Sequence, residues 1–186
     1  MNILQNFDSE ILKFINDNFN SPIMDKIMVI VTSLGNGGLI WILISLALMI
    51  KPKYRRVGIM SICALILTTI IGEGILKNLV KEERPFISLP DIKLLITPPT
   101  SFSFPSGHTG SSFAVAGVLG SKIKKSRFYV FALAILIAFS RLYLYVHYPI
   151  DVIVGIILGL FCAKIVLYIF KRREKDNYNR NFKNLY

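Results

Sequence analysis

The sequence has few of the residues that build disulfides, metal sites and acidic surfaces. Its 186 residues include only two cysteines, two histidines and 11 acidic residues. Cys63 and Cys162 both lie inside apolar stretches, so we interpret them as buried side chains rather than as a disulfide or a metal-binding pair. No cluster of carboxylates and histidines suggests a metal, and we expect no cofactor. We find no internal repeat or low-complexity linker, which favours a single domain over residues 1–186.

Negative charge is outweighed by positive charge. The chain has 22 lysines and arginines against 11 aspartates and glutamates, which gives a formal net charge of +11 at pH 7. Hydrophobic residues make up 53% of it and the mean hydropathy is +0.55, too apolar for an ordinary soluble domain. The basic residues stand in short clusters between apolar stretches, as they do beside membrane helices. We therefore expect contact with membrane lipids and not with nucleic acid.

Apolar stretches recur along the chain at lengths close to the roughly 20 residues that a helix needs to cross a bilayer. They predict an all-α fold, a polytopic membrane helix bundle of five or six spans. In the last two thirds of the chain we expect helices over residues 54–80, 106–121, 127–145 and 150–170. Pro149 suits the first turn of the last helix, where its missing N–H leaves no hydrogen bond unmade.

The first 50 residues leave two alternatives open. Residues 1–20 lack the basic start and apolar core of a signal peptide. Their apolar side chains recur at helical spacing, which predicts an amphipathic helix that lies on the membrane surface or packs against the bundle. Gly35-Asn36-Gly37-Gly38 separates the apolar stretches 23–34 and 39–50. This break is either a kink in one span or a turn after a half-inserted helix, and we favour the turn.

Three basic clusters predict the orientation in the cell membrane. They lie at residues 51–56, 122–127 and 171–186, and the positive-inside rule places all of them, including the C-terminal tail, in the cytoplasm. Residues 81–105 form the one long loop, and long loops in compact folds are usually functional. This loop and the turn around His147 then face outward. Three tyrosines at that boundary predict an aromatic belt: Tyr143, Tyr145 and Tyr148.

Charged side chains gather at one depth of the predicted bundle. Both histidines, His108 and His147, fall at the outer ends of predicted helices. Three cations fall at the same level: Lys77, Arg84 and Arg141. Charged groups at membrane depth are costly and mark functional sites. Three cations without a matching cluster of carboxylates suit an anion, and phosphate fits the planar arginine fork.

A helix start and a carboxylate complete this predicted site. Ser106 and Gly107 open a helix, whose N-terminus presents free N–H groups and a partial positive charge to a phosphate. One histidine can attack phosphorus as a neutral imidazole while the other protonates the leaving oxygen. Asp151, four residues after His147, can hold the ring N–H and fix the attacking tautomer. A transporter for phosphate-like anions would also use the cations, but it does not require the paired histidine and aspartate.

Three motifs carry a resemblance to a known family. They are Lys77-x6-Arg84-Pro85, Pro105-Ser106-Gly107-His108 and Ser140-Arg141-x5-His147-x3-Asp151. Together they resemble the signature of the type-2 phosphatidic acid phosphatase superfamily. The resemblance implies a membrane phosphatase that needs no metal. It gives His147 the role of nucleophile, Asp151 that of its orienting partner and His108 that of the acid. It also implies a phosphate cradle, made of Lys77, Arg84, Ser106, Gly107 and Arg141.

The short chain resembles the compact bacterial members, which act on undecaprenyl pyrophosphate or phosphatidylglycerophosphate. An outward-facing site favours undecaprenyl pyrophosphate, which appears on that side after wall polymers are built. Phosphatidylglycerophosphate and phosphatidic acid are the alternative substrates. Glu73 stands one turn before Lys77, and we expect the two to form an i,i+4 ion pair. The sequence does not indicate an oligomeric state.

Overall fold

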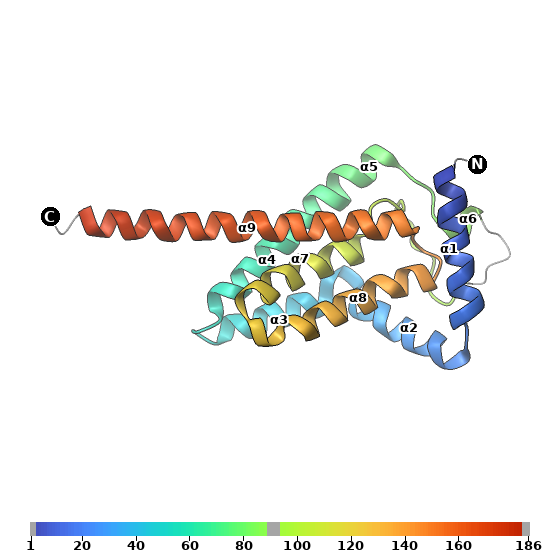
Figure 1. Ribbon diagram of the computed structural model, residues 1–186, viewed down its shortest axis with the longest axis horizontal. Coiled ribbons are helices and arrows are strands. Elements are labelled where there is room, and N and C mark those ends of the chain that lie inside the picture. The colour runs from blue at the N-terminus through green and yellow to red at the C-terminus, as the bar shows by residue number, and fades with distance from the viewer. Residues whose placement is uncertain (1–2, 89–93, 184–186) are drawn as a thin grey trace.

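The chain folds into a bundle of helices around a buried helix, α7 (Figure 1). The computed structural model describes residues 3–88 and 94–183, and within them the regular structure is helical. The α-helices are α1 (Ile3–Phe19), α2 (Pro22–Leu34), α3 (Leu39–Ile50), α4 (Arg55–Thr69), α5 (Lys77–Val80), α6 (Pro85–Ser88), α7 (Gly107–Lys122), α8 (Arg127–Tyr143) and α9 (Pro149–Lys183). A π-helix, η2 (Ile70–Leu76), joins α4 to α5, and short 3-10 helices are η1 (Asn36–Gly38) and η3 (Lys124–Ser126). The predicted all-α fold is confirmed.

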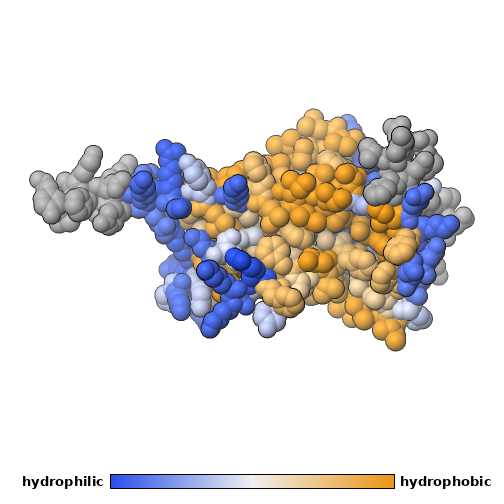
Figure 2. Space-filling view, viewed as in Figure 1, coloured by the Kyte–Doolittle hydropathy of each residue, from blue (hydrophilic) through white to orange (hydrophobic). Residues whose placement is uncertain are grey.

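The surface is that of a multi-pass membrane protein. On the face that Figure 2 shows, a broad apolar band covers the middle of the molecule, with hydrophilic side chains toward both ends. Three segments are long and apolar enough to cross a membrane: Arg55–Ser88, Lys124–Tyr143 and Pro149–Asp176. The bent pair α2–α3 adds a fourth if it is one span. The described residues thus hold three or four candidate spans, fewer than the five or six predicted. The prediction also counted α7, whose 16 residues fall short of the roughly 20 that a span needs.

Two glycines break the first apolar stretch. Gly37 and Gly38 have φ values of 57° and 70°, a left-handed backbone that glycine adopts without steric cost. The axes of α2 and α3 differ by 48° across this break. In Figure 1 the two helices follow one another from the end of the molecule near α1 toward the opposite end. A bend of this size is found both in a broken span and in a re-entrant segment, so both alternatives from the sequence stand.

Helix α7 sits at the centre because small residues let α9 approach it closely. A Cβ atom on Gly155 would lie 2.9 Å from the carbonyl oxygen of Ser106, and one on Gly159 would lie 2.8 Å from the backbone nitrogen of Ala114. On another side of α7, Trp41 of α3 donates a hydrogen bond of 2.8 Å to Ser112. Small residues at helix interfaces are the usual means of tight packing in membranes. The N-termini of α7 and α9 are thereby held side by side.

Helix α1 packs against the bundle, which was one of the two arrangements predicted for it. It crosses the ends of α8 and α9 (Figure 1), and its residues Leu12 and Ile15 are buried. The hydroxyl of Tyr145 donates to the backbone oxygen of Leu12 at 3.1 Å, and that of Tyr143 donates to Asp25 at 2.5 Å. Both tyrosines are buried. The predicted aromatic belt is therefore wrong for them, because they hold α1 and α2 to the bundle.

Helix α9 continues past the predicted boundary at residue 170. It runs to Lys183, so the basic segment is helical as far as that residue. Near its start the segment is tied to α4 by Arg56, which pairs with Glu174 and donates a hydrogen bond of 3.0 Å to the backbone oxygen of Phe170. The charged side chains after residue 170 can be solvated by water, so the helix can continue beyond the apolar stretch.

Candidate active site

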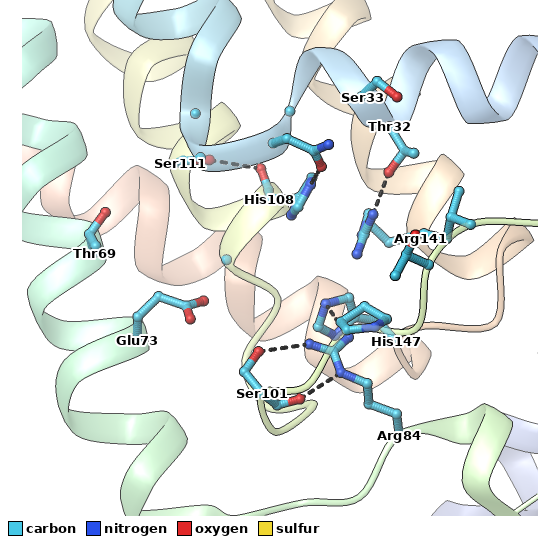
Figure 3. Close-up of a pocket in the computed structure, with 18 of the residues that line it drawn as sticks. Thr32, Ser33, Thr69, Glu73, Arg84, Ser101, His108, Ser111, Arg141 and His147 are labelled. Carbon is cyan, nitrogen blue, oxygen red and sulfur yellow. Dashed lines mark hydrogen bonds between the residues drawn. The ribbon is translucent and has the colours of Figure 1, made fainter.

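A cavity of about 750 Å³ opens between α2, η1, η2, α7, α8 and the segment before α7. Figure 3 shows its lining side chains pointing toward a common centre from these elements. Six of the eight residues predicted for the site line this cavity: Lys77, Arg84, Gly107, His108, Arg141 and His147. The other two lie next to residues that line it. Asp151 contacts His147, and Ser106 caps the helix that carries His108. The fold thus gathers all the predicted site residues in one place.

His147 is buried in the turn between α8 and α9, with 2% of its surface exposed. Its Nδ1 lies 3.2 Å from Oδ2 of Asp151, one turn further on. The same carboxylate oxygen accepts hydrogen bonds from the Ser103 hydroxyl at 2.5 Å and from the backbone N–H of Tyr148 at 2.8 Å. Three donors around one oxygen fix the carboxylate in place. A fixed carboxylate in turn fixes the orientation of the imidazole ring.

Both ring nitrogens of His147 indicate the same tautomer. Nε2 lies 3.3 Å from Nη1 of Arg84, which can only donate. Nε2 therefore accepts, and the ring proton sits on Nδ1, facing Asp151. This is the tautomer that leaves an electron pair on Nε2, the nitrogen nearest the cavity cations. A neutral imidazole of this form is a nucleophile.

The charge state of His147 suits that role. Burial, opposed by the hydrogen bond to Asp151 and helped by the nearby cations Arg141 and Arg84, lowers the pKa of His147 to about 3. Its imidazole is then neutral throughout the physiological pH range. The contact with Asp151 is consequently a hydrogen bond from a neutral ring rather than an ion pair.

Arg84 is held rigidly by backbone oxygens. Its Nε donates to the carbonyl of Ser101 at 2.7 Å, its Nη2 to that of Phe102 at 3.1 Å and its Nη1 to that of Val146 at 2.6 Å. Only 3% of its surface is exposed. A buried guanidinium that is fixed in one plane is preorganised to bind an anion without losing side-chain freedom.

Arg141 enters the cavity from the last turn of α8 and is equally buried. Its Nη1 donates to the hydroxyl of Thr32 on α2. Its Nε has no hydrogen-bond partner among the described residues. A buried, unpaired N–H on a charged group is costly, so this arginine retains a donor for a ligand in the cavity.

Lys77 is the third cation, and it forms the ion pair predicted from sequence. Its ammonium lies 2.8 Å from both carboxylate oxygens of Glu73, one turn earlier. Glu73 belongs to the π-helix η2, a wide turn of the kind often found at functional sites. Its carboxylate lies against Gly107, so a side chain at that position would have to displace it.

Ser106 caps α7, because its hydroxyl accepts a hydrogen bond of 3.4 Å from the N–H of Thr109.

His108 lies on the first turn of α7, across the cavity from Glu73 (Figure 3). Its Nε2 is 2.9 Å from Oδ1 of Asn36, in the break between α2 and α3. Beside that nitrogen, a Cβ atom on Gly35 would lie 2.7 Å from the ring carbon Cδ2. The break therefore packs directly against this histidine.

Sequence reasoning missed four residues that hold the predicted site in place: Thr32, Asn36, Ser101 and Ser103. Ser101 and Ser103 stand in the loop predicted to be functional, just before the Pro105 motif, but no spacing rule links a loop serine to a distant carboxylate. Asn36, in contrast, could have been predicted to line the site. Irregular backbone at membrane depth is tolerated where it lines a cavity, and Asn36 is the polar residue of such a break.

Carboxylates are too scattered here to suggest a metal centre. In residues 3–88 and 94–183, no three His, Cys, Asp or Glu side chains gather closely enough to hold a metal ion. The cavity is instead lined by cations and histidines, which suit an anion.

Comparison with known proteins identifies the family. The model of the PAP2 superfamily matches residues 58–175, which include all three motifs. The chain belongs to this superfamily, and the family predicted from the motifs is confirmed. It is a membrane lipid phosphatase, an enzyme that hydrolyses lipid phosphate esters.

Three proteins of known structure or function are similar to this chain. An undecaprenyl-diphosphatase of Sulfolobus acidocaldarius is 33% identical over 165 residues, which are 88% of this chain and 78% of that protein. The crystal structure of LpxE from Aquifex aeolicus is 34% identical with a TM-score of 0.75, covering 86% of this chain and 93% of that one. A PAP2 type phosphatidylglycerolphosphate phosphatase from Bacillus subtilis is 25% identical with a TM-score of 0.76, covering 92% and 88%.

Proposed function

We propose that this phosphatase hydrolyses undecaprenyl pyrophosphate to undecaprenyl phosphate through a phosphohistidine on His147. One observation carries the mechanism: the buried, neutral His147 presents its unprotonated Nε2 beside Arg84 in a cavity that also holds Arg141 and Lys77. Similarity to the undecaprenyl-diphosphatase supports the choice of substrate, as does the predicted outward-facing site.

The terminal phosphate binds first. Arg84 and Arg141 donate to its oxygens and Lys77 contributes a point charge. The N-terminus of α7, at Ser106 and Gly107, adds backbone N–H groups and the positive end of the helix dipole. The transition state is five-coordinate at phosphorus, with charge spread over the equatorial oxygens. Fixed donors aimed at those oxygens need no reorganisation during the reaction, so they should supply much of the rate enhancement.

Chemistry proceeds in two steps. Nε2 of His147 forms a bond to phosphorus while the bond to the leaving oxygen breaks, and His108 gives that oxygen a proton. Asp151 stabilises the positive charge that appears on the phosphorylated ring. Water then attacks phosphorus and gives a proton to His108, and the phosphorus–nitrogen bond breaks. Inorganic phosphate leaves, His147 is neutral again and His108 is ready to act as an acid.

Phosphatidylglycerophosphate and phosphatidic acid are the alternative substrates, and similarity to the B. subtilis phosphatase favours the first of them. The test is phosphate release by purified protein in detergent, with each of the three lipids. We expect the highest kcat/KM with undecaprenyl pyrophosphate. Its second phosphate adds at least one charge-assisted hydrogen bond, worth about 1.5–3 kcal/mol, or tenfold and more in kcat/KM. A preference for either monophosphate would overturn the proposed substrate, and no release from any of them would overturn the proposed reaction.

The proposed orientation places the active site outside and the C-terminus in the cytoplasm. We expect a cysteine at the exposed Ser88 to react with a membrane-impermeant thiol reagent on intact cells. A cysteine at the exposed Lys175 should react only after the cells are opened. Both substitutions belong in a Cys63→Ala, Cys162→Ala background, which removes the two natural thiols. Labelling of Lys175→Cys but not of Ser88→Cys on intact cells would reverse the topology.

A further inference from the structure

The two ring nitrogens of His108 are in different situations. Nε2 is engaged by the side-chain oxygen of Asn36 at 2.9 Å. Among the described residues, no hydrogen bond is formed by Nδ1, which is the ring nitrogen left to face the cavity. When His108 acts as an acid, both nitrogens carry protons, and both donate. Only an oxygen can then pair with Nε2, and the amide of Asn36 supplies one.

We propose that Asn36 is a positioning residue for proton transfer: its amide oxygen accepts the Nε2 proton of His108 and directs Nδ1 toward the leaving oxygen. This inference rests on the acid role proposed for His108. It gives the second histidine an orienting partner, as Asp151 orients His147, but a neutral one on a different helix.

The break in the first span explains how Asn36 reaches the ring. A continuous helix from α2 into α3 would carry side chains at this position past α7. Instead the backbone turns at Gly37 and Gly38, both with positive φ, and η1 presents Asn36 to His108. Gly35 completes the contact, because any Cβ there would overlap the ring. The ring is therefore confined between α7 and the break, with one nitrogen on Asn36.

The charge around His108 explains why the partner is an amide. The ring shares its cavity with Arg141 of α8, Lys77 of α5, Arg84 and His147 of the loops and Glu73 of η2, and Asp151 of α9 lies behind His147. Burial, and then the surrounding cations, lower the pKa of His108, so an acceptor on Nε2 helps to sustain the imidazolium form. A carboxylate would do so more strongly, but its negative charge would stand beside the leaving group of an anionic substrate. An amide oxygen accepts the proton without that repulsion.

The first test compares leaving groups. Phenyl phosphate and p-nitrophenyl phosphate have nearly the same shape, but p-nitrophenol leaves without help from an acid. We expect Asn36→Leu to lower kcat for phenyl phosphate about 10- to 100-fold, because positioned acid catalysis contributes about 10²–10⁴-fold in all. Activity on p-nitrophenyl phosphate should fall less than threefold. His108→Ala should show the same selectivity with a larger loss, and Asn36→Leu should add nothing in the His108→Ala background.

The second test is the pH profile, which a merely structural role would not move. Asn36→Asp places a carboxylate on Nε2 and stabilises the imidazolium. The alkaline limb of kcat for phenyl phosphate should therefore move up by about 1 pH unit or more, the usual effect of an opposite charge at this distance. KM should rise because the new charge repels the substrate. Ser33→Ala is the matched control, since Ser33 lines the same wall but bonds only within α2, to the oxygen of Val29 at 2.7 Å.

Two results would overturn the inference. One is an equal loss on both esters with Asn36→Leu, and the other is an unmoved alkaline limb with Asn36→Asp. These are distinguishable from failure of the proposed mechanism itself. If His108→Ala also lost activity equally on both esters, the acid role of His108 would be wrong. If His108→Ala kept the selectivity and Asn36→Leu lacked it, only the role of Asn36 would be wrong.

Discussion

His147→Ala should lower kcat by roughly 10⁴-fold or more, because it removes the atom that accepts the phosphoryl group. The loss should be the same for every substrate. Activated esters should not be spared, since attack on phosphorus precedes any help to the leaving group. The measurement is phosphate release in detergent, with enough enzyme to detect a residual rate.

The same variant should still bind an anion. Ser101 holds Arg84, Thr32 holds Arg141 and Glu73 holds Lys77, so the cradle does not depend on the histidine alone for its shape. Vanadate, which readily becomes five-coordinate, should inhibit the natural enzyme. In the variant, phosphate should still raise the melting temperature, as any ligand that binds only the folded state does. Loss of phosphate binding together with activity would mean that His147 supports the cavity rather than attacking phosphorus.

Gly159→Ala should destabilise the protein and lower its activity, although Gly159 lies outside the cavity. Its new Cβ would lie 2.8 Å from the Ala114 nitrogen and 3.1 Å from the Phe113 Cβ, and it would press on the carbonyl of Gly110. These are mostly backbone atoms of the buried α7, which cannot rotate away. Helices α7 and α9 must therefore move apart. Overpacking of this kind costs about 1–3 kcal/mol, which lowers the melting temperature of a protein of this size by about 2–4 °C per kcal/mol.

The Gly159→Ala variant should also have a lower kcat. Helix α7 carries His108 and helix α9 carries Asp151, so separating them misaligns the acid and the nucleophile. A misplacement of 1 Å can cost about 10²-fold in rate. Gly74→Ala is the matched control, because the same methyl group there meets no atom within 4 Å. It should leave both the melting temperature and kcat nearly unchanged. Equal behaviour of the two variants would show that close packing of α7 on α9 does not align the site.

The local part of the site could be predicted from sequence because its contacts are local. Glu73 and Lys77 are four residues apart along continuous helical structure, and His147 stands four residues before Asp151, in the turn that leads into α9, so short separations in sequence bring each pair together. Alternation of apolar stretches with basic clusters also predicted the helices closely. The segment over residues 3–19 is helical with the expected limits.

The remainder depends on tertiary packing that no spacing rule reports. Asn36 meets His108 across 72 residues, and Thr32 meets Arg141 across 109. The first of these contacts depends on the break between α2 and α3, where Gly37 and Gly38 have positive φ and the helix axes differ by 48°. The tyrosines at positions 143 and 145 were misassigned for a related reason. Composition cannot separate a tyrosine at the lipid boundary from one that is buried beneath an amphipathic helix.

The central claim is that the phosphoryl group passes through His147. The most direct test uses substrate labelled in its terminal phosphate, with the reaction stopped rapidly under conditions that avoid acid. The labelled protein is then digested and the modified residue is mapped. The mechanism predicts label on His147, stable to base and labile to acid, as a phosphoramidate is, with none in His147→Ala. Label on Ser106 or Asp151 would contradict it, as would full turnover by the His147→Ala protein.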